Sequence, residues 1–245
     1  MIWIEYSIGK AELAHRAPPL RYRIIRSLRG AQMTRFFRCL VPASAMVVLA
    51  ACTSAPVTEA AQQAKVAEVQ RAPIAGVPQR AVDKPAITLV LFSDYACRHC
   101  RQLHGVLARA IAANPDLRIV YRDWPILGAQ SRKAARYAIA SAFQGRHAEF
   151  DTALMNREGP LDDAALRAAV ARAGLDPERL DRDLAQHRTR IDAILADNDR
   201  LARSLGLQGT PGMVVGDYLI PGGVDEETMR AILEVVRKRQ TPSPA

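Results

Sequence analysis

Apolar residues along the chain follow two different periods, and each period predicts a type of element. Residues 87–92 are almost continuously apolar and partly β-branched, which is typical of a strand buried on both faces of a sheet. Residues 98–113 carry apolar side chains at helical spacing and stop at Asn114-Pro115, so they predict a helix. Alternation at 117–122 predicts a second strand. The connection is long enough for a right-handed parallel β-α-β unit.

Helices are predicted for most of the next stretch. Residues 134–143 and 147–156 form two of them. Two more begin at aspartates that can serve as N-caps, Asp162 and Asp176. A further helix has its apolar face between residues 191 and 205 and ends at a glycine. This helical block separates the first two strands from the next strand signals.

Strands return near the C-terminus. Residues 213–215 and 218–220 flank a Gly-Asp dipeptide, which is a strong signal for a hairpin turn. A last helix is predicted from about Asp225. The order is therefore β-α-β, a block of helices, then β-β-α. We predict an α/β thioredoxin fold with a helical insertion at about 129–207.

Two of the four cysteines, Cys97 and Cys100, lie at the junction of the first strand with the first helix. A thiol at a helix N-terminus is exposed to the partial positive charge of unpaired backbone N–H groups, which favours the reactive thiolate. Arg98 and His99 stand between the cysteines, and their positive charge is expected to lower the pKa of Cys97 further. Strand, C-x-x-C and helix in this order are typical of a thioredoxin-like redox site.

The spacing of the two cysteines also predicts their roles. Three positions apart, both sulfurs lie on one side of the first helical turn. Cys97, nearer the end of the helix and expected to be more exposed, is predicted to be the attacking sulfur. Cys100, one turn deeper, is predicted to resolve the mixed disulfide. This chemistry requires no cofactor beyond the Cys97–Cys100 disulfide itself.

Residues 33–51 are predicted to be a secretion signal. From Met33 the chain has two arginines and then an apolar run that is shorter than the roughly 20 residues of a membrane-spanning helix. The run ends in Leu-Ala-Ala-Cys, which resembles the lipobox of bacterial lipoproteins, so Cys52 is the predicted lipidation site. An ordinary cleaved signal with an incidental cysteine is the alternative.

The remaining boundaries follow from composition. Residues 1–32 are interpreted as an extension upstream of the true start and are left out of fold reasoning. Residues 52–83 are rich in Ala, Gln, Val and Pro, so they are predicted to be a tether that buries little surface, with at most a transient helix near 57–69. Residues 84–240 have a suitable length for one domain, and 241–245 are a tail.

The positive net charge comes mostly from the leader. The full chain carries +9, but residues 1–51 hold eight basic and two acidic side chains, so the remaining chain carries +3. A mildly basic domain whose basic residues are not interleaved with aromatic ones gives little reason to expect a nucleic-acid partner.

Four short segments resemble the DsbA-type thiol–disulfide oxidoreductases of bacterial envelopes, especially their lipoprotein and outer-membrane relatives. In chain order they are Phe-Ser-Asp-Tyr-Ala-Cys-Arg-His-Cys at 92–100, Tyr-Arg-Asp-Trp-Pro at 121–125, Gly-Thr-Pro at 209–211 and Pro-Gly-Gly at 221–223. The resemblance implies a cis bond between Thr210 and Pro211 beside the cysteines, where a substrate strand can pair with the backbone. It extends over about residues 85–240.

The family implies an envelope enzyme that forms disulfides in secreted proteins. Its partners would be secreted or envelope proteins with free thiols and a membrane quinone-linked protein that re-oxidises it. A reductase or an isomerase, the former served by a membrane reductant, shares the fold and motif and is the alternative. The expected location is the periplasm, with a lipid anchor in the membrane. Thr53 follows Cys52 in place of aspartate, and this resembles the sorting signal of lipoproteins that Gram-negative bacteria send to the outer membrane.

Two positions depart from the family pattern. Arg98-His99 replaces the proline followed by histidine or tyrosine that relatives often have. Leu91 stands where many relatives carry a buried acid that moves a proton to or from the second cysteine. Water, or Asp94 if its side chain reaches the site, is expected to take over this task.

Two other uses of the cysteines compete with the redox interpretation. Cys97, Cys100 and His104 could bind copper or zinc from one helix face, but a structural zinc site has four ligands and the predicted domain contains no further cysteine. A purely structural disulfide would close a very short loop and therefore stabilise the fold only weakly. The redox interpretation is preferred.

Overall fold

The computed structural model describes residues 58–72 and 75–240. The predictions for the leader at 1–51, for lipidation at Cys52 and for the tail at 241–245 lie outside these residues. No helix within the described ranges is both long and apolar enough to span a membrane.

One mixed sheet lies at the centre of the described domain. Its strands are β1 (Gln79–Arg80), β2 (Ile87–Ser93), β3 (Leu117–Asp123), β4 (Gly212–Val215) and β5 (Tyr218–Pro221). The order across the sheet is β1-β3-β2-β4-β5, with β2 and β3 parallel and the other neighbours antiparallel. The predicted β-α-β unit and C-terminal hairpin are therefore confirmed.

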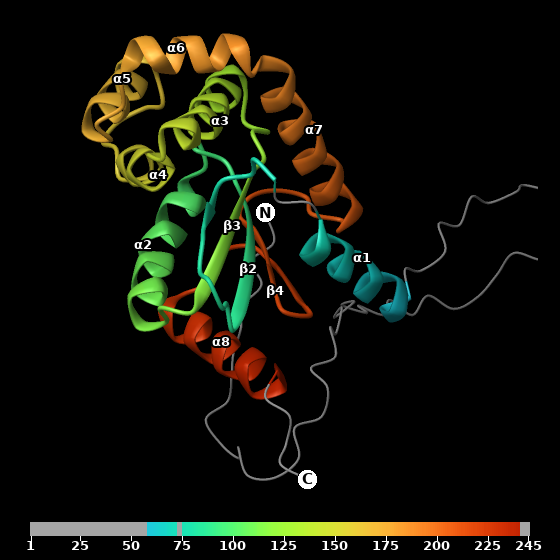
Figure 1. The fold of residues 1–245 in the computed structure, drawn as a ribbon. Coiled ribbons are helices and arrows are strands. Elements are labelled where there is room, and N and C mark those ends of the chain that lie inside the picture. Colours follow the sequence, from blue (N-terminus) through green and yellow to red (C-terminus); the bar gives the residue numbers. More distant parts are fainter. Residues whose placement is uncertain (1–57, 73–74, 241–245) are drawn as a thin grey trace, which may run out of the picture. The chain divides into compact units, whose positions relative to one another are not determined.

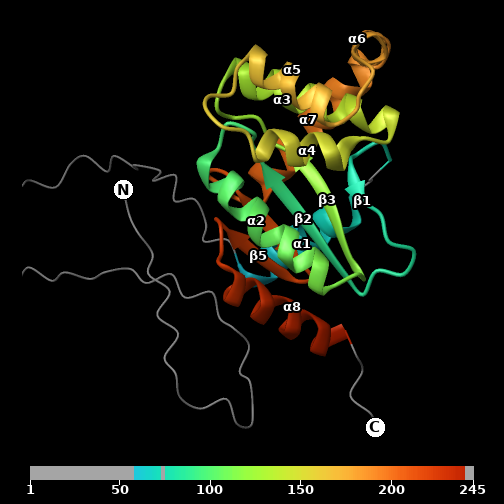
Figure 2. The ribbon, with the colours of Figure 1, turned by 90° about the vertical axis from the view of Figure 1, so that its left-hand side faces the viewer.

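Helices cover both faces of this sheet (Figures 1 and 2). They are α1 (Glu59–Arg71), α2 (Arg98–Ala113), α3 (Ala129–Ser141), the 3-10 turn η1 (Ala142–Gln144), α4 (His147–Met155), α5 (Asp163–Arg172), α6 (Pro177–Gln186), α7 (Arg188–Ser204) and α8 (Glu226–Gln240). Leu89 and its alternate neighbours on β2 pack against α2 and α8. Val90 and Phe92 point to the opposite face, where α1 and α7 contribute to the core. Burial on both faces explains the continuous apolar run of β2.

The helical insertion falls between β3 and β4, so the predicted thioredoxin fold with an insertion at about 129–207 is confirmed. Two of its helices begin at the predicted N-caps. The carboxylate of Asp162 accepts a hydrogen bond from the Ala165 N–H at 2.8 Å, and that of Asp176 accepts one from the Arg179 N–H at 3.0 Å. In both views, α3 to α6 gather beyond one end of the strands (Figures 1 and 2).

The structure corrects one boundary, because the segment before residue 84 packs on the domain. Val66 and Val69 of α1 are buried in the core. The Gln70 side-chain amide donates to the carbonyls of Thr88 and Gly216, at 3.3 and 3.2 Å. β1 also pairs with β3. The expectation that 52–83 buries little surface is therefore wrong for its described part.

Candidate active site

The two cysteines lie at the start of α2, as the sequence predicts. Cys97 is the N-cap residue, and its sulfur accepts a hydrogen bond from the Cys100 N–H at 3.4 Å. Both thiols are free. Cys97 is 6% exposed and Cys100 is 3% exposed, so exposure distinguishes the two residues only slightly. The different roles predicted for the two residues therefore depend mainly on their acidities.

Hydrogen bonds separate the acidities of the two thiols. A hydrogen bond from Cys100 is the largest cause that lowers the pKa of Cys97, to about 5. Burial opposes this shift, while the Thr210 side chain and the N–H groups of Cys100 and His99 support it. The hydrogen bond to Cys97, followed by burial, raises the pKa of Cys100 above its usual range. Cys97 is therefore a thiolate at neutral pH, whereas Cys100 remains a thiol.

The side chains of Arg98 and His99 are both exposed. His99 contributes its backbone N–H to the lowered pKa of Cys97, and its Nδ1 lies 3.1 Å from Oε1 of Gln102. The expectation that the side-chain charges of these two residues also lower this pKa stays a prediction.

The loop before β4 brings Thr210 and Pro211 to the cysteines. The Thr210–Pro211 peptide bond is cis. In its thiol form Cys97 donates to the Thr210 carbonyl at 3.2 Å. A side chain at Gly223 would contact both Pro211 and the His99 carbonyl, at 3.7 and 3.9 Å. The Thr210–Pro211 loop therefore meets the Cys97 sulfur, and Gly223 lies beside Pro211 and the backbone of His99.

Asp94 stabilises the active-site turn through its carboxylate, and this carboxylate is therefore not available to act on Cys100. Its buried carboxylate accepts hydrogen bonds from the Ala96 N–H at 2.8 Å, the Leu127 N–H at 2.9 Å and the Ser131 hydroxyl at 2.6 Å. Only the Asp94 backbone N–H reaches the Cys100 sulfur. The hypothesis that the Asp94 carboxyl replaces the acid missing at Leu91 finds no support in this geometry.

Arg157 also binds this turn, a role that the sequence did not indicate. Its buried guanidinium donates to the carbonyls of Tyr95 at 2.8 Å and Leu154 at 3.0 Å. Arg101, in the first turn of α2, donates to the carbonyls of Met155 and Arg157. These contacts fix the start of α2 against the end of α4. No local motif marks the contacts of Arg157 with Tyr95 and of Arg101 with Met155 and Arg157, because these partners are more than fifty positions apart.

His104 does not join the cysteines. Its Nε2 lies 3.2 Å from Oδ2 of Asp151 on α4. Across the described ranges, no group of three or more His, Cys, Asp and Glu side chains is arranged to hold a metal ion. The geometry therefore gives the proposed metal set of Cys97, Cys100 and His104 no support.

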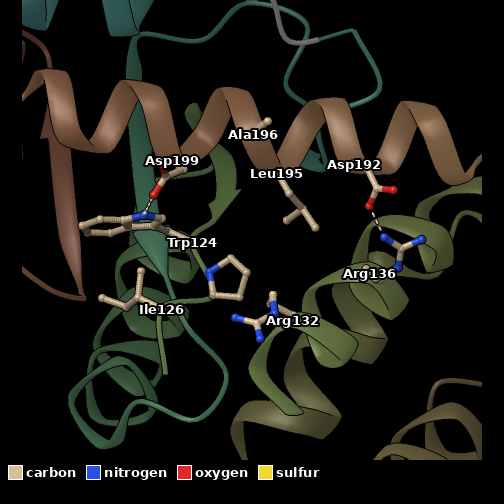
Figure 3. Close-up of a pocket in the computed structure, with 9 residues that line it drawn as sticks. Trp124, Ile126, Arg132, Arg136, Asp192, Leu195, Ala196 and Asp199 are labelled. Atoms are coloured by element: carbon tan, nitrogen blue, oxygen red, sulfur yellow. Dashed lines mark hydrogen bonds and ion pairs between the residues drawn. The ribbon is translucent and has the colours of Figure 1, made fainter. Parts of the chain in front are cut away.

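An apolar hollow borders the loop that Asp94 holds (Figure 3). Its cavity of about 310 Å³ is lined by Trp124, Ile126 and Leu195, with Arg136 and Asp192 paired at its rim. The Trp124 indole N–H donates to Asp199 at 2.9 Å.

The loop beside this hollow also exposes apolar surface. Ile126 is 38% exposed and Leu127 is 53% exposed, and they are the large apolar side chains exposed in the described part of the chain. Because the Leu127 N–H is bound by Asp94, this apolar surface lies close to the turn that carries the cysteines.

Comparison with known proteins agrees with this geometry. The model of the family described as "DSBA-like thioredoxin domain" matches residues 88–234. A curated relative, the Na(+)/H(+) antiporter NhaA 1 of Mycolicibacterium gilvum (strain PYR-GCK), is 29% identical over 154 residues, which are 62% of this chain and 25% of the relative. The chain thus spans about a quarter of the length of the curated relatives it matches.

Two solved structures show the same fold. A thioredoxin-like oxidoreductase from Silicibacter pomeroyi DSS-3 is 36% identical with a TM-score of 0.63, and the match covers 66% of this chain and 93% of that one. A periplasmic thioredoxin-like protein from Salmonella enterica serovar Typhimurium is 28% identical with a TM-score of 0.63, covering 71% and 96%. With a Cys97 thiolate, a Cys100 thiol and a cis-proline loop assembled at one helix end, the chain belongs to the DSBA-like thioredoxin domain family and is a thiol–disulfide oxidoreductase.

Proposed function

We propose that this oxidoreductase works as a dithiol oxidase that forms disulfides in secreted or envelope proteins. The observation that carries the proposal is the place of Cys97 as N-cap of α2, where its sulfur accepts a hydrogen bond from the Cys100 N–H at 3.4 Å. Hydrogen bonds to this sulfur lower the pKa of Cys97 to about 5. These bonds stabilise the thiolate, which exists only in the reduced enzyme. A stabilised reduced form makes the disulfide a stronger oxidant.

The reaction follows from the two acidities. A client thiolate attacks the Cys97 sulfur of the disulfide, the Cys97–Cys100 bond breaks, and Cys100 leaves with the electron pair and takes up a proton. The second client thiolate then attacks the client sulfur that is bonded to Cys97. Cys97 leaves as a thiolate without needing a proton, because its pKa is about 5. The client is oxidised by two electrons and the enzyme is reduced by two.

Client binding is proposed at the loop of Thr210 and Pro211. The Thr210 carbonyl lies 3.2 Å from the Cys97 sulfur, so a client strand that pairs with the loop would place its own thiol near Cys97. The exposed apolar side chains of Ile126 and Leu127, on the loop that Asp94 binds, offer a second contact for a client close to the active-site turn. We further propose that a membrane quinone-linked partner re-oxidises the enzyme.

We propose a periplasmic location with a lipid anchor at Cys52, directed to the outer membrane. The signal pattern at 33–51 and the Leu-Ala-Ala-Cys sequence support the anchor, and Thr53 supports outer-membrane sorting. The Cys52→Ala substitution should move the protein from the membrane fraction to the soluble fraction. Retention of the variant in the membrane fraction would contradict the anchor.

A substrate assay tests the proposed direction. The oxidised protein, mixed with a reduced and unfolded model substrate, should form about one substrate disulfide per enzyme, and a Cys97→Ser variant should form none. If the reduced protein instead reduces native disulfides rapidly while the oxidised form leaves substrate thiols unchanged, the reductase alternative holds. The isomerase alternative is tested with a second substrate that carries scrambled disulfides, which an isomerase would reshuffle into the native pairing.

A further inference from the structure

The apolar hollow lies between the loop that follows β3 and the helices α3 and α7 (Figure 3). The apolar part of its lining consists of Trp124, Pro125, Ile126, Leu195 and Ala196. The cavity of about 310 Å³ is at the lower end of the range for ligand-binding pockets. A space of this size holds one or two side chains of a bound chain rather than the surface of a folded protein.

Hydrogen bonds within the domain hold the walls of the apolar hollow in place. At the end of β3, Arg122 donates to the side-chain oxygen of Asn198 on α7 at 3.2 Å, and the Asn198 amide donates to the carbonyl of Asp123 at 2.9 Å. The Trp124 indole N–H donates to Asp199, the next residue of α7, at 2.9 Å. Consecutive residues at the strand end thus bind consecutive residues of the helix. The hollow is therefore formed before a ligand binds, so little ordering cost opposes binding.

The apolar hollow carries one positive charge that no neighbouring acid neutralises. Arg136 at its rim pairs with Asp192. Asp199, which also lines the hollow, pairs with Arg203 at 2.8 Å. Arg132 is exposed on α3, its side chain lies among the lining residues (Figure 3), and it has no ion-pair partner within the described residues. An apolar lining beside a free guanidinium suits a ligand that carries an apolar group next to a carboxylate.

The loop that lines the apolar hollow is bound to the turn that carries the cysteines. One oxygen of the Asp94 carboxylate accepts from the Leu127 N–H at 2.9 Å. The other accepts from the Ala96 N–H at 2.8 Å, one residue before Cys97. The exposed side chains of Ile126 and Leu127 continue the apolar surface on this loop. A segment bound in the hollow therefore lies near the turn that precedes Cys97.

We propose that the apolar hollow binds a segment of an unfolded client protein in which a large apolar side chain stands next to an acidic residue. The apolar side chain packs against Trp124 and Leu195, and the carboxylate pairs with Arg132. This contact is separate from the client strand proposed at Thr210, and it selects clients by their sequence. Holding a client here raises the effective concentration of its thiols near Cys97. Such binding presupposes the thiol-bearing clients proposed above, but it serves oxidation and reduction of their thiols alike.

An unfolded chain is the occupant that fits this surface. Folded proteins bury most of their large apolar side chains, whereas unfolded chains expose them. A concave site for one or two side chains suits a single flexible segment, and the one uncompensated charge of Arg132 suits one carboxylate. A membrane surface would instead require several cations around a protruding apolar surface.

Peptides without cysteine test the proposal in the absence of redox chemistry. Fluorescein-labelled Gly-Ser-Phe-Glu-Leu-Ser-Gly is compared with the same peptide in which lysine replaces the glutamate, and binding to the full chain is measured by fluorescence anisotropy. The wild type should bind the glutamate peptide about two- to fivefold more tightly, because one exposed ion pair contributes up to about this factor. Arg132→Glu should reverse the preference. Arg167→Glu changes the charge of an exposed arginine on α5 outside the hollow, so this matched control should keep the wild-type preference.

A second pair of variants tests the apolar part of the hollow. Ala196 is exposed on α7 and lines the hollow, so the indole of Ala196→Trp would occupy its space without replacing a core side chain. This variant should weaken binding of the glutamate peptide about tenfold or more, because the peptide can no longer bury a large apolar side chain there. Ala193→Trp adds the same indole to the same helix at an exposed position outside the hollow, and it should bind the peptide like the wild type.

The proposal is overturned if Arg132→Glu keeps the wild-type preference, or if Ala196→Trp binds the glutamate peptide as tightly as Ala193→Trp does. It is also overturned if the wild type binds neither peptide; binding to vesicles of phosphatidylglycerol and phosphatidylethanolamine in that case would make a lipid surface the occupant. Because the peptides lack cysteine, a loss of peptide binding leaves the oxidase assignment of Cys97 untouched, and a failed oxidase assay leaves the binding results untouched.

Discussion

The Thr210→Val substitution tests whether a hydrogen bond from the Thr210 hydroxyl helps to set the pKa of Cys97. Threonine and valine have nearly the same shape, so the substitution removes the hydroxyl and little else. The Thr210 side chain lowers the pKa of both cysteine sulfurs. The Thr210 carbonyl, which lies 3.2 Å from the Cys97 sulfur, is retained in the variant. The expected result is a higher pKa for Cys97.

The size of the effect follows from the value of one hydrogen bond to a charged group, about 1.5–3 kcal/mol. Since one pKa unit corresponds to about 1.4 kcal/mol, the pKa of Cys97 should rise by about one to two units from its value of about 5. The thiolate fraction at pH 7 should fall from about 99% to between roughly 50 and 90%. The reduced form loses the same stabilisation, so the disulfide should become a weaker oxidant by about 30–60 mV.

Thiolate absorbance at 240 nm, followed against pH in the reduced protein, gives the pKa directly. Cys97→Ser should abolish the transition and so assign it. Thr152→Val, at an exposed position on α4, is the control for a threonine-to-valine change and should leave the midpoint where it is. If Thr210→Val also leaves the midpoint unchanged, the hydroxyl does not set this acidity and the reasoning is refuted.

Three further predictions concern trapping, pH and packing. Cys100→Ser should accumulate mixed disulfides between Cys97 and client proteins, seen as thiol-sensitive bands on gels, and a failure to trap any would contradict the assigned roles. The unfolded reduced chain binds more protons than the folded one between about pH 5 and 9, because the Cys97 pKa is lowered from 9.0 to about 5 on folding. Denaturant unfolding should therefore show the reduced form gaining stability relative to the oxidised form as pH rises through this window, and losing the gain as pH falls to about 5; a pH-independent difference would disprove it. Val66→Ala should lower the free energy of unfolding by about 2 kcal/mol, whereas the exposed Gln63→Ala should change it little, and equal effects would show that α1 is not packed in solution.

The central part of the fold could be predicted because its signals are local. The apolar run of β2, the helical period after Cys100 and the hairpin dipeptide each appear within a few neighbouring residues. The same holds for the N-caps Asp162 and Asp176. The redox pair was found for the same reason, since its spacing and its place at a helix start are both visible in the sequence.

The parts that were missed depend on contacts between distant residues. The α1 segment was predicted to be a tether because its apolar pattern is weak. The pattern is weak because α1 packs on the domain through only two buried side chains, Val66 and Val69. The role of Asp94 was misjudged because two of its three donors, Leu127 and Ser131, lie more than thirty positions away. The apolar hollow gave no signal, since its lining residues come from the loop after β3, from α3 and from α7, and meet only in three dimensions.

The equilibrium constant of the Cys97–Cys100 pair with glutathione tests the central claim most directly. Wild-type protein, freed of bound metal, is equilibrated with defined ratios of reduced and oxidised glutathione, and the fraction of reduced enzyme is read by thiol alkylation. The stabilised Cys97 thiolate predicts an oxidising pair, with a potential nearer to the value of about −120 mV for DsbA than to that of about −270 mV for thioredoxin. A potential near or below the thioredoxin value would contradict the account.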